Sequence, residues 1–225
     1  MPQNLQTRRE REKEQRRNDI IDAAERVFFS KGRATATMDD VAEEAELSKG
    51  TLYLYFKSKE ELYLAIHLRG LGILKKMFAE AVAKKQTGIG KTRAVGEAYY
   101  QFYLDQPDYF NALIYFESLE QAMQEENPVA NECIMEGINT LNILVEAINI
   151  GIKDGTIRPD VDPVKMAHIL WGYTSGLIQL LHLKGNFLRE KYHVKNDEMI
   201  QYAYDFIRIG LERKINEKNT EKDND

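Results

Sequence analysis

The sequence has few of the residues that cross-link a chain or hold a metal. Its single cysteine, Cys133, excludes an intramolecular disulfide and lies among apolar residues, so we interpret it as part of the core. The four histidines form no HExxH motif, and without a cysteine pair we predict neither a metal site nor a cofactor. We also find no apolar run approaching the roughly 20 residues that cross a bilayer. A cytoplasmic protein without a membrane partner is therefore predicted.

Proline and alternating β-branched residues are scarce as well. Five prolines occur in 225 residues, while apolar residues recur at spacings of three and four, the helical period. We therefore predict an all-α fold of about nine helices, with an N-terminal three-helix helix-turn-helix domain and a C-terminal helical domain. The expected helices cover residues 16–31, 38–45, 49–56, 59–88, 91–106, 108–123, 128–153, 163–183 and 197–216.

Capping residues and glycines divide these helices into domains. Thr37 with Asp40, and Ser58 with Glu61, resemble capping boxes that open the second and fourth helices. Gly88 and Gly90 mark the predicted domain hinge. The predicted domains are a charged N-terminal arm (1–15), a helix-turn-helix domain (16–60), a helical ligand-binding and dimerisation domain reached through the fourth helix (61–216) and a disordered tail (217–225).

A basic excess, the usual mark of a nucleic-acid-binding chain, is absent, since the formal net charge is −5. The first 60 residues contain 12 basic and 12 acidic side chains, so the acidity belongs to the remainder. Within the first 17 residues, six basic side chains accompany three acidic ones. Because the two signs alternate there, the pattern favours a solvated helical extension over an arm lying in the minor groove.

The short third helix has an unusual outer face. At 100° per residue, Leu52 and Phe56 share its inner face. The outer face and its edges carry Lys49, Gly50, Thr51, Tyr53, Leu54 and Tyr55. An ordinary surface helix displays charges outward, so this face is predicted to meet a partner. In a helix-turn-helix, the second helix is the one that enters a DNA major groove.

These residues belong to a longer pattern. It runs through Ile21-x-Ala23-Ala24-x-x-x-Phe28, then Thr37-Met38-Asp39-Asp40-Val41-Ala42, and then Ser48-Lys49-Gly50-Thr51-Leu52-Tyr53-Leu54-Tyr55-Phe56-Lys57-Ser58-Lys59-Glu60-Glu61-Leu62. Over residues 16–66 the pattern resembles the DNA-binding domain of the tetracycline-repressor (TetR) family. The resemblance implies a homodimer that binds a pseudo-palindromic operator in double-stranded DNA, and a variable C-terminal domain that receives a small-molecule effector.

The resemblance also implies particular DNA contacts. Lys49, Gly50 and Tyr53 are expected near base edges, and Thr37, Tyr55 and Lys59 near phosphates. Ser48 caps the third helix, whose free N–H groups attract phosphate. We hypothesise that Thr51 or Leu54 touches thymine methyl groups. Two positions depart from the commonest pattern, because Glu46 stands where glycine is usual and Leu54 replaces an aromatic residue or histidine. A positive φ at Glu46 would strain the turn.

The C-terminal domain contains many aromatic residues, concentrated in residues 99–116. They predict a pocket for an apolar ligand, although aromatic residues at helical spacing also build ordinary cores. The candidate pocket residues are Phe102, Tyr103, Tyr115, Phe116, Leu119, Trp171 and Ser175. Two helices from each subunit would form a four-helix dimer interface, with packing inside one chain as the alternative. The candidate interface residues are Thr174, Ile178, Leu181, Phe206, Ile207 and Gly210.

Catalytic and nucleotide-binding motifs are absent: the sequence has no GxSxG, Walker A or dinucleotide fingerprint, so an enzyme is not predicted. We predict a DNA-binding transcriptional regulator, a repressor released by a small, mostly apolar ligand. Two alternatives stay open. One is a TetR-like DNA-binding protein without small-molecule induction, acting as an architectural or protein-partnered binder. The other is a helical lipid-binding protein or enzyme.

Overall fold

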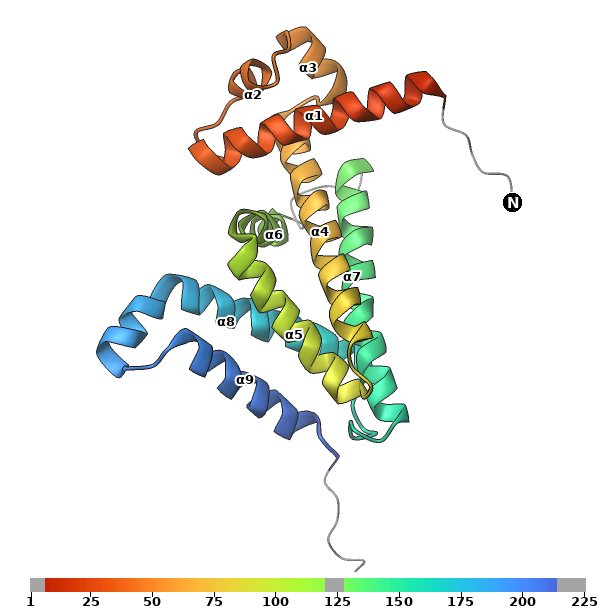
Figure 1. The fold of residues 1–225 in the computed structure, drawn as a ribbon, viewed down its shortest axis with the longest axis vertical. Helices are drawn as coiled ribbons and strands as arrows, with labels where there is room; N and C mark the ends of the chain where they lie inside the picture. Colours follow the sequence, from red (N-terminus) through yellow and green to blue (C-terminus); the bar gives the residue numbers. More distant parts are fainter. Residues whose placement is uncertain (1–6, 120–127, 214–225) are drawn as a thin grey trace, which may run out of the picture. The chain divides into compact units, whose positions relative to one another are not determined.

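The computed structural model describes residues 7–119 and 128–213, with the side chains of 117–119 outside the description. These residues are helical almost throughout (Figure 1), which confirms the predicted all-α class. The helices are α1 (Arg8–Lys31), α2 (Met38–Glu44), α3 (Lys49–Tyr55), α4 (Lys59–Ala83), α5 (Gly88–Asp105), α6 (Pro107–Leu119), α7 (Pro128–Lys153), α8 (Pro163–Tyr192) and α9 (Asn196–Leu211).

Two compact units make up the fold. Unit 1 comprises Met1–Gly72 and Gln106–Glu136, and unit 2 comprises Ile73–Asp105 and Gly137–Asp225. Unit 1 therefore contains α1–α3, the first half of α4, α6 and the start of α7. The functional division into arm, DNA-binding domain and ligand-binding domain stays a prediction, and the expected tail at 217–225 lies outside the described residues.

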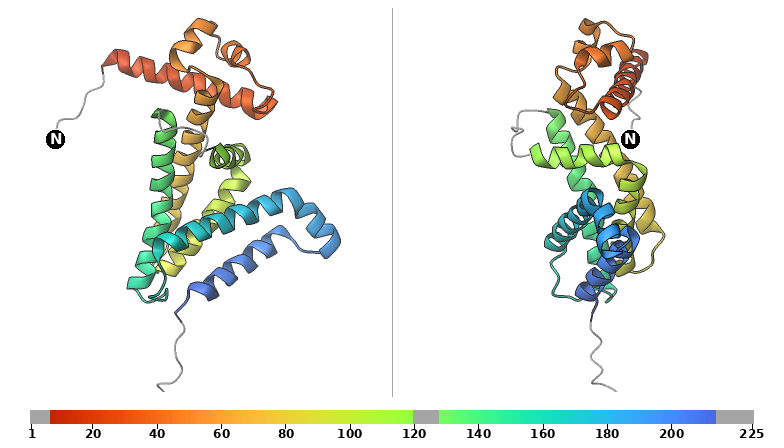
Figure 2. Two further views of the ribbon diagram at one scale, coloured as in Figure 1. Left: turned by 180° about the vertical axis from the view of Figure 1, so that it is seen from behind. Right: turned by 90° about the vertical axis from the view of Figure 1, so that its left-hand side faces the viewer.

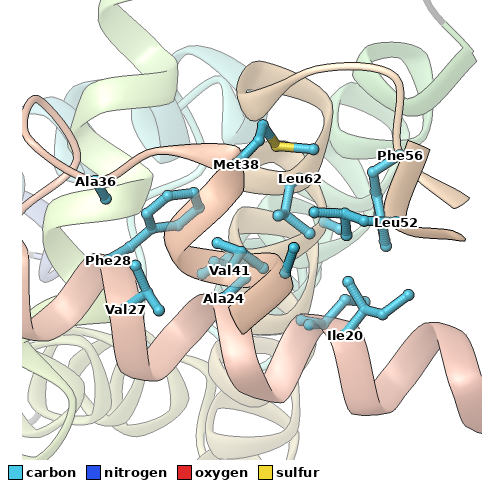
Figure 3. Close-up of a cluster of buried hydrophobic side chains, with 14 residues drawn as sticks. Ile20, Ala24, Val27, Phe28, Ala36, Met38, Val41, Leu52, Phe56 and Leu62 are labelled. Carbon is cyan, nitrogen blue, oxygen red and sulfur yellow. The ribbon is translucent and has the colours of Figure 1, made fainter. Parts of the chain in front are cut away.

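A dense apolar core holds α1 to α4 together in unit 1 (Figure 3). Ile20 and Phe28 of α1 meet Val41 of α2, Leu52 of α3 and Leu62 of α4, and all five side chains are buried. Burying a side chain of this size contributes about 1.5–3 kcal/mol, far more than helix propensity contributes to a seven-residue helix. The core therefore fixes the short helices α2 and α3 against α1 (Figure 2).

Local hydrogen bonds set the ends of these helices. At the start of α2, the Thr37 hydroxyl accepts from Asp40 N, and the Thr37 amide donates to the Asp40 carboxylate at 2.8 Å, which is the predicted capping box. A second capping box, Thr7 with Glu10, opens α1 eight residues before the predicted start at residue 16. The charged segment before residue 16 is therefore a continuation of α1 from Arg8 onward.

Two helices of unit 2 end at residues other than those predicted, and tertiary contacts lie close to both ends. α8 continues nine residues beyond Leu183 and ends at His193, whose φ of 58° is left-handed. Gly185 lies within α8 and allows the start of α9 to approach closely, since a Cβ there would lie 2.8 Å from Asn196 Oδ1. α9 ends at Leu211 rather than 216, where the Arg158 amide donates to the Leu211 carbonyl at 3.0 Å.

Judged by length and composition alone, the described helix α7 is long and apolar enough to cross a membrane. This finding corrects the expectation that no apolar stretch of the sequence is long enough to do so. Its buried residues are Ala130, Cys133, Thr140, Leu144, Ala147, Ile148 and Gly151. They recur at helical spacing, as expected for a helix that packs one face into a helical protein. Cys133 is buried, as its sequence context indicated.

Candidate nucleic-acid interface and apolar cavity

Helix α3 is held from within and open on its outer side. Leu52 and Phe56 are buried in the unit 1 core, whereas Leu54 is 75% exposed and Tyr53 is 42% exposed. The Ser48 hydroxyl caps the helix by accepting from Thr51 N at 3.1 Å. An apolar leucine at the outer centre of a surface helix gains nothing from water, so this face is suited to a partner surface.

Polar side chains border the outer face of α3. The Lys49 ammonium forms an ion pair with Asp39 of α2 at 2.6 Å, and both side chains are exposed. Lys57 donates to the Tyr53 carbonyl at 2.8 Å. Tyr55 is half-buried against the unit 1 core. Positive groups therefore stand on either side of the exposed Tyr53 and Leu54.

Gly50 has no packing reason to be glycine. A Cβ built at Gly50 would meet only Ser48 Oγ at 3.9 Å, an ordinary contact. Glycine inside a helix costs about 1 kcal/mol relative to alanine. The protein's own packing therefore does not account for Gly50, whereas close approach of an external surface would.

Thr37 and Lys59 come together beside α2. The Lys59 ammonium donates to the Ala36 carbonyl at 2.7 Å and to the Ala34 carbonyl at 3.3 Å, immediately before Thr37. The ion pair and hydrogen bond from Lys31, followed by the hydrogen bonds from Thr37, lower the pKa of Asp40 to about 2. The turn between α2 and α3 contains Glu46 with φ 54°, so the condition under which this turn would be strained is met.

Unit 2 contains an apolar cavity of about 180 Å³. Its walls come from α4, α5, α7, α8 and α9 and are lined by Phe78, Ile89, Gly90, Thr92, Arg93, Val95, Gly96, Tyr99, Leu144, Leu170, Trp171, Thr174, Tyr204, Ile207, Arg208 and Leu211. Tyr99 and Trp171 stack with ring centroids 4.6 Å apart. The Tyr99 hydroxyl hydrogen-bonds to Ser175 Oγ at 3.0 Å, so its polar end is satisfied. The cavity is therefore suited to an apolar molecule.

The predicted pocket residues occupy several places. Trp171 lines the cavity, Phe102 is fully buried, and Ser175 is buried where it bonds to Tyr99. The Tyr103 hydroxyl hydrogen-bonds to His182 Nδ1 at 3.0 Å. Sequence reasoning did not select Phe78, Leu144 or Tyr204, because the lining of the cavity comes from helices that are far apart in the chain.

Tyr115 and Phe116 lie in unit 1, around a second cavity of only about 10 Å³. Phe116 stacks on the buried His67 with ring centroids 4.2 Å apart. Burial lowers the pKa of His67 to about 4, and neither ring nitrogen has a hydrogen-bond partner among the described residues. This space has room for about one water molecule, not for an effector. The side chain of Leu119 is outside the described residues.

Helix α8 is apolar on two opposite faces. Thr174, Ile178 and Leu181, the α8 residues predicted for a dimer interface, are buried within the chain. The opposite face exposes a stripe at helical spacing, comprising Ile169, Gly172, Tyr173, Gly176, Leu180, Leu183 and Phe187. Tyr173 stacks with Phe206 of α9 at 6.5 Å, so the stripe continues onto α9. Of the other predicted residues, Phe206 and Gly210 are exposed and Ile207 lines the cavity.

The groups above show no arrangement for metal chemistry, since the described residues contain no cluster of three metal-binding side chains. An exposed helix-turn-helix in one compact unit and an apolar cavity in the other instead define a DNA-binding transcription regulator. This class includes many families, and comparison with known proteins identifies the one that applies.

Residues 20–66 match the family described as bacterial regulatory proteins, tetR family. The chain is 29% identical over 153 residues to the fatty acid metabolism regulator protein of Bacillus subtilis (strain 168), covering 68% of this chain and 76% of that protein. It is 36% identical over 90 residues to the HTH-type transcriptional activator FasR of Mycolicibacterium smegmatis, covering 40% and 41% of the two chains. Residues 20–66 are therefore a DNA-binding domain of the TetR family, and the chain is similar to a transcriptional regulator over about two thirds of its length.

The fold is similar beyond the matched domain. The transcriptional regulator FadR from Bacillus subtilis, solved in complex with stearoyl-CoA, aligns with a TM-score of 0.66 at 20% identity, over 86% of this chain and 98% of that one. At this identity the likeness establishes a shared fold, and both compact units take part in it.

Proposed function

We propose that the protein is a homodimeric repressor that leaves its operator when an apolar molecule fills the unit 2 cavity. The outer face of α3 carries this proposal, because exposed Leu54 and Tyr53 beside an unexplained Gly50 fit a major groove better than they fit water. The match of residues 20–66 to the TetR family supports the same reading. As a DNA-binding regulator the protein acts in the cytoplasm and is not an enzyme.

DNA recognition divides into base contacts and phosphate contacts. Lys49 and Tyr53 face base edges, with Gly50 permitting close approach of the helix. Thr37, Tyr55 and Lys59 face phosphates on either side of the groove, and Ser48 caps the recognition helix between them. Because Lys59 is already anchored on the Ala36 carbonyl, its ammonium is held in place for a phosphate rather than ordered on binding.

Dimerisation supplies the second half-site. A monomer would expose the α8 stripe around Leu183, which is 76% accessible, and the adjoining Phe206 of α9, which is 64% accessible. Gly172 and Gly176 have no neighbour within 4 Å and leave room for a second helix to approach. Two such faces related by a twofold axis form a four-helix interface and present one α3 to each half of a pseudo-palindrome.

The effector class follows from the cavity walls. Most of the lining surface is apolar, and the polar end of Tyr99 is already bonded to Ser175. Arg93, Arg208 and Tyr204 contribute polar groups to the lining, and the Tyr204 hydroxyl has no hydrogen-bond partner among the described residues. The similar FadR structure is in complex with stearoyl-CoA. We infer a small apolar or acyl-bearing effector, whose binding shifts the population of dimers away from the spacing that matches the operator.

The test begins with selection of duplexes from a random-sequence pool by the purified protein at fixed salt. An enriched palindrome is expected, and Lys49→Ala should weaken binding to it severalfold or more, while Lys195→Ala, far along the chain in the loop before α9, should not. Absence of any sequence enrichment would overturn the repressor assignment in favour of an architectural binder.

The effector is tested on the selected duplex with stearoyl-CoA as the probe. Release of the protein by stearoyl-CoA is expected, together with loss of that response in Leu170→Arg, which places a charge in the cavity. A matched control is Val164→Arg, an exposed position of α8 that lies off the stripe. Release that is equally strong in Leu170→Arg would show that the probe acts elsewhere.

The oligomeric state is measured by sedimentation. Leu183→Glu should give monomers, whereas Val164→Glu, an exposed apolar residue of α8 off the stripe, should leave the dimer intact. A dimer in Leu183→Glu at micromolar concentration would contradict the proposed interface.

A further inference from the structure

The first three turns of α1 have no role in the protein's own core. The first buried residue of α1 is Ile20, and residues 8–16 are all exposed, so this part of the helix extends past the helix-turn-helix without packing against it (Figure 1; Figure 2, left). Local interactions support the helix there: the Thr7–Glu10 capping box and an ion pair between Arg8 and Glu12 at 2.7 Å. An ordered, exposed extension costs chain entropy, and these local interactions offset it without any contribution from burial in the unit 1 core.

Charge is segregated around this extension. At 100° per residue, Arg9, Lys13, Arg16 and Arg17 share the face that farther along α1 buries Ile20. We call these four residues the basic stripe. The far side of the helix carries Arg8 and Arg11, with Glu12 and Glu14 toward its edges. The alternation of signs along the sequence therefore separates into a basic face and a mixed face once the helix forms.

The carboxylates nearest the basic stripe are engaged elsewhere. Glu10 accepts from the Thr7 amide at 2.7 Å, and Glu12 pairs with Arg8. Across residues 7–119 and 128–213, no salt bridge involves Arg9, Lys13 or Arg16, and all three are exposed. The stripe is thus a row of available cations.

The position of the stripe relates it to α3. The Arg17 guanidinium lies 5.1 Å from the ring centroid of Phe56, the residue that ends α3. From there the stripe runs away from α3 for about 12 Å, with side chains roughly one helical turn apart. The basic stripe lies on the face of α1 that is turned toward α3. Its side chains therefore point to the same side of unit 1 as the exposed outer face of α3.

We propose that the basic stripe binds the phosphate backbone of duplex DNA immediately beside the base pairs that α3 contacts. This rests on the proposed function, in which α3 enters the major groove. The charge complementarity is direct, since duplex DNA presents one negative charge for about every 1.7 Å of its axis. Arginine and lysine are the usual phosphate ligands, and such contacts set the register of a DNA-binding domain without reading sequence.

The experiment compares two double variants with equal charge changes. Arg9→Gln/Lys13→Gln removes two cations from the stripe, and Arg8→Gln/Arg11→Gln removes two from the opposite face. Each is titrated against the duplex selected by the wild-type protein, with ten flanking base pairs on each side, between 50 and 200 mM salt. Circular dichroism checks that α1 remains helical, because glutamine keeps a high helix propensity.

Each dimer carries two stripes, so the stripe variant should release about four fewer counterions, and its plot of log affinity against log salt should be shallower by about 3.6. Between the two salt concentrations the wild type should then lose about a hundredfold more affinity than the stripe variant. The opposite-face variant should keep the wild-type slope. Removing the flanking base pairs should weaken the wild type and leave the stripe variant nearly unchanged.

Equal slopes in the two variants would overturn the proposal, because they would mean that only net charge matters. A wild-type slope in the stripe variant would also overturn it and leave the extension as a solvated helix. If the wild type binds no duplex at all, the proposed function itself fails. If it binds and the variants behave alike, only the role of the stripe fails.

Discussion

The Tyr109 hydroxyl donates a 2.7 Å hydrogen bond to Glu25 Oε1, which joins α6 to α1 within unit 1. Arg69 of α4 contacts the other oxygen of the same carboxylate at 2.8 Å. The Tyr109 ring also packs on Gly70, where an added Cβ would lie 3.1 Å from it. Burial, together with the hydrogen bond to Glu25, raises the pKa of Tyr109 to about 12, so the phenol stays protonated and remains a donor.

Tyr109→Phe removes this donor and keeps the ring. A hydrogen bond to a charged group contributes about 1.5–3 kcal/mol, so we expect the free energy of unfolding to fall by about 2 kcal/mol in urea titrations. Tyr192→Phe, which changes an exposed tyrosine of α8, is the control and should cost little. Equal stability of Tyr109→Phe and the wild type would contradict a structural role for the bond.

The capping box at α2 predicts a pH dependence. The pKa of Asp40 is about 2 in the folded protein, below its ordinary value, so the ionised carboxylate stabilises the fold. That contribution is complete above about pH 4 and is lost as pH falls through about 2. The difference in unfolding free energy between wild type and Asp40→Asn should therefore be largest near neutrality and shrink on acidification. A difference in unfolding free energy that is constant from pH 7 to pH 2.5 would refute the role of the ionised Asp40 carboxylate. Asp105→Asn, which removes an exposed carboxylate, is the control.

Features set by local chemistry could be predicted from the sequence, and features set by distant contacts could not. The α2 capping box involves residues three apart, and its sequence signature was sufficient. The cavity instead joins Ile89, Leu144 and Ile207, and no local pattern brings these three together. The aromatic segment 99–116 also divides between the two units, a separation that composition does not reveal.

Which face of α8 is buried could not be predicted from the sequence, for a different reason. Both of its faces are apolar, so helical spacing alone does not indicate which one packs inside. The prediction selected Thr174 and Ile178 for the dimer interface, and these lie on the buried face. The pair Gly172 and Gly176 was the available signal for the exposed face, because small residues one turn apart permit close helix approach.

A close backbone approach between α5 and α7 predicts a severe effect at Gly88. A Cβ there would overlap the backbone of Gly151 and lie 2.7 Å from the Ala147 carbonyl oxygen. Since backbone atoms cannot move aside as a side-chain end does, Gly88→Ala should destabilise unit 2 by about 1–3 kcal/mol or more. Gly137→Ala has no neighbour within 4 Å and should be neutral or slightly stabilising. Thermal unfolding of the two variants gives the comparison, and similar melting temperatures would exclude the close approach.

The exposed Leu54 predicts a change in sequence preference rather than in overall affinity. Apolar side chains in the major groove contact the thymine methyl group, and the 75% exposed Leu54 is the most prominent such group on α3. Leu54→Ala should reduce the preference for thymine over cytosine at one position of each half-site, by a factor of up to about ten. Selection from random duplexes measures this directly. An unchanged thymine preference in Leu54→Ala would rule out the contact and leave Thr51 as the remaining candidate.

The strained turn between α2 and α3 predicts a stabilising substitution. Glu46 has φ 54°, a conformation that costs an L-residue about 1–2 kcal/mol and glycine very little. Glycine loses more chain entropy on folding, by about 0.5–1 kcal/mol, so Glu46→Gly should raise the free energy of unfolding by about 0.5–1 kcal/mol. Glu46→Gln separates strain from charge, because it keeps the strained backbone and removes only the carboxylate. In urea titrations Glu46→Gly should be more stable than both Glu46→Gln and the wild type. Both variants should bind the operator somewhat more tightly than the wild type, because each removes a negative charge near phosphate. If Glu46→Gly proved less stable than Glu46→Gln, the positive φ would not be the source of strain in this turn.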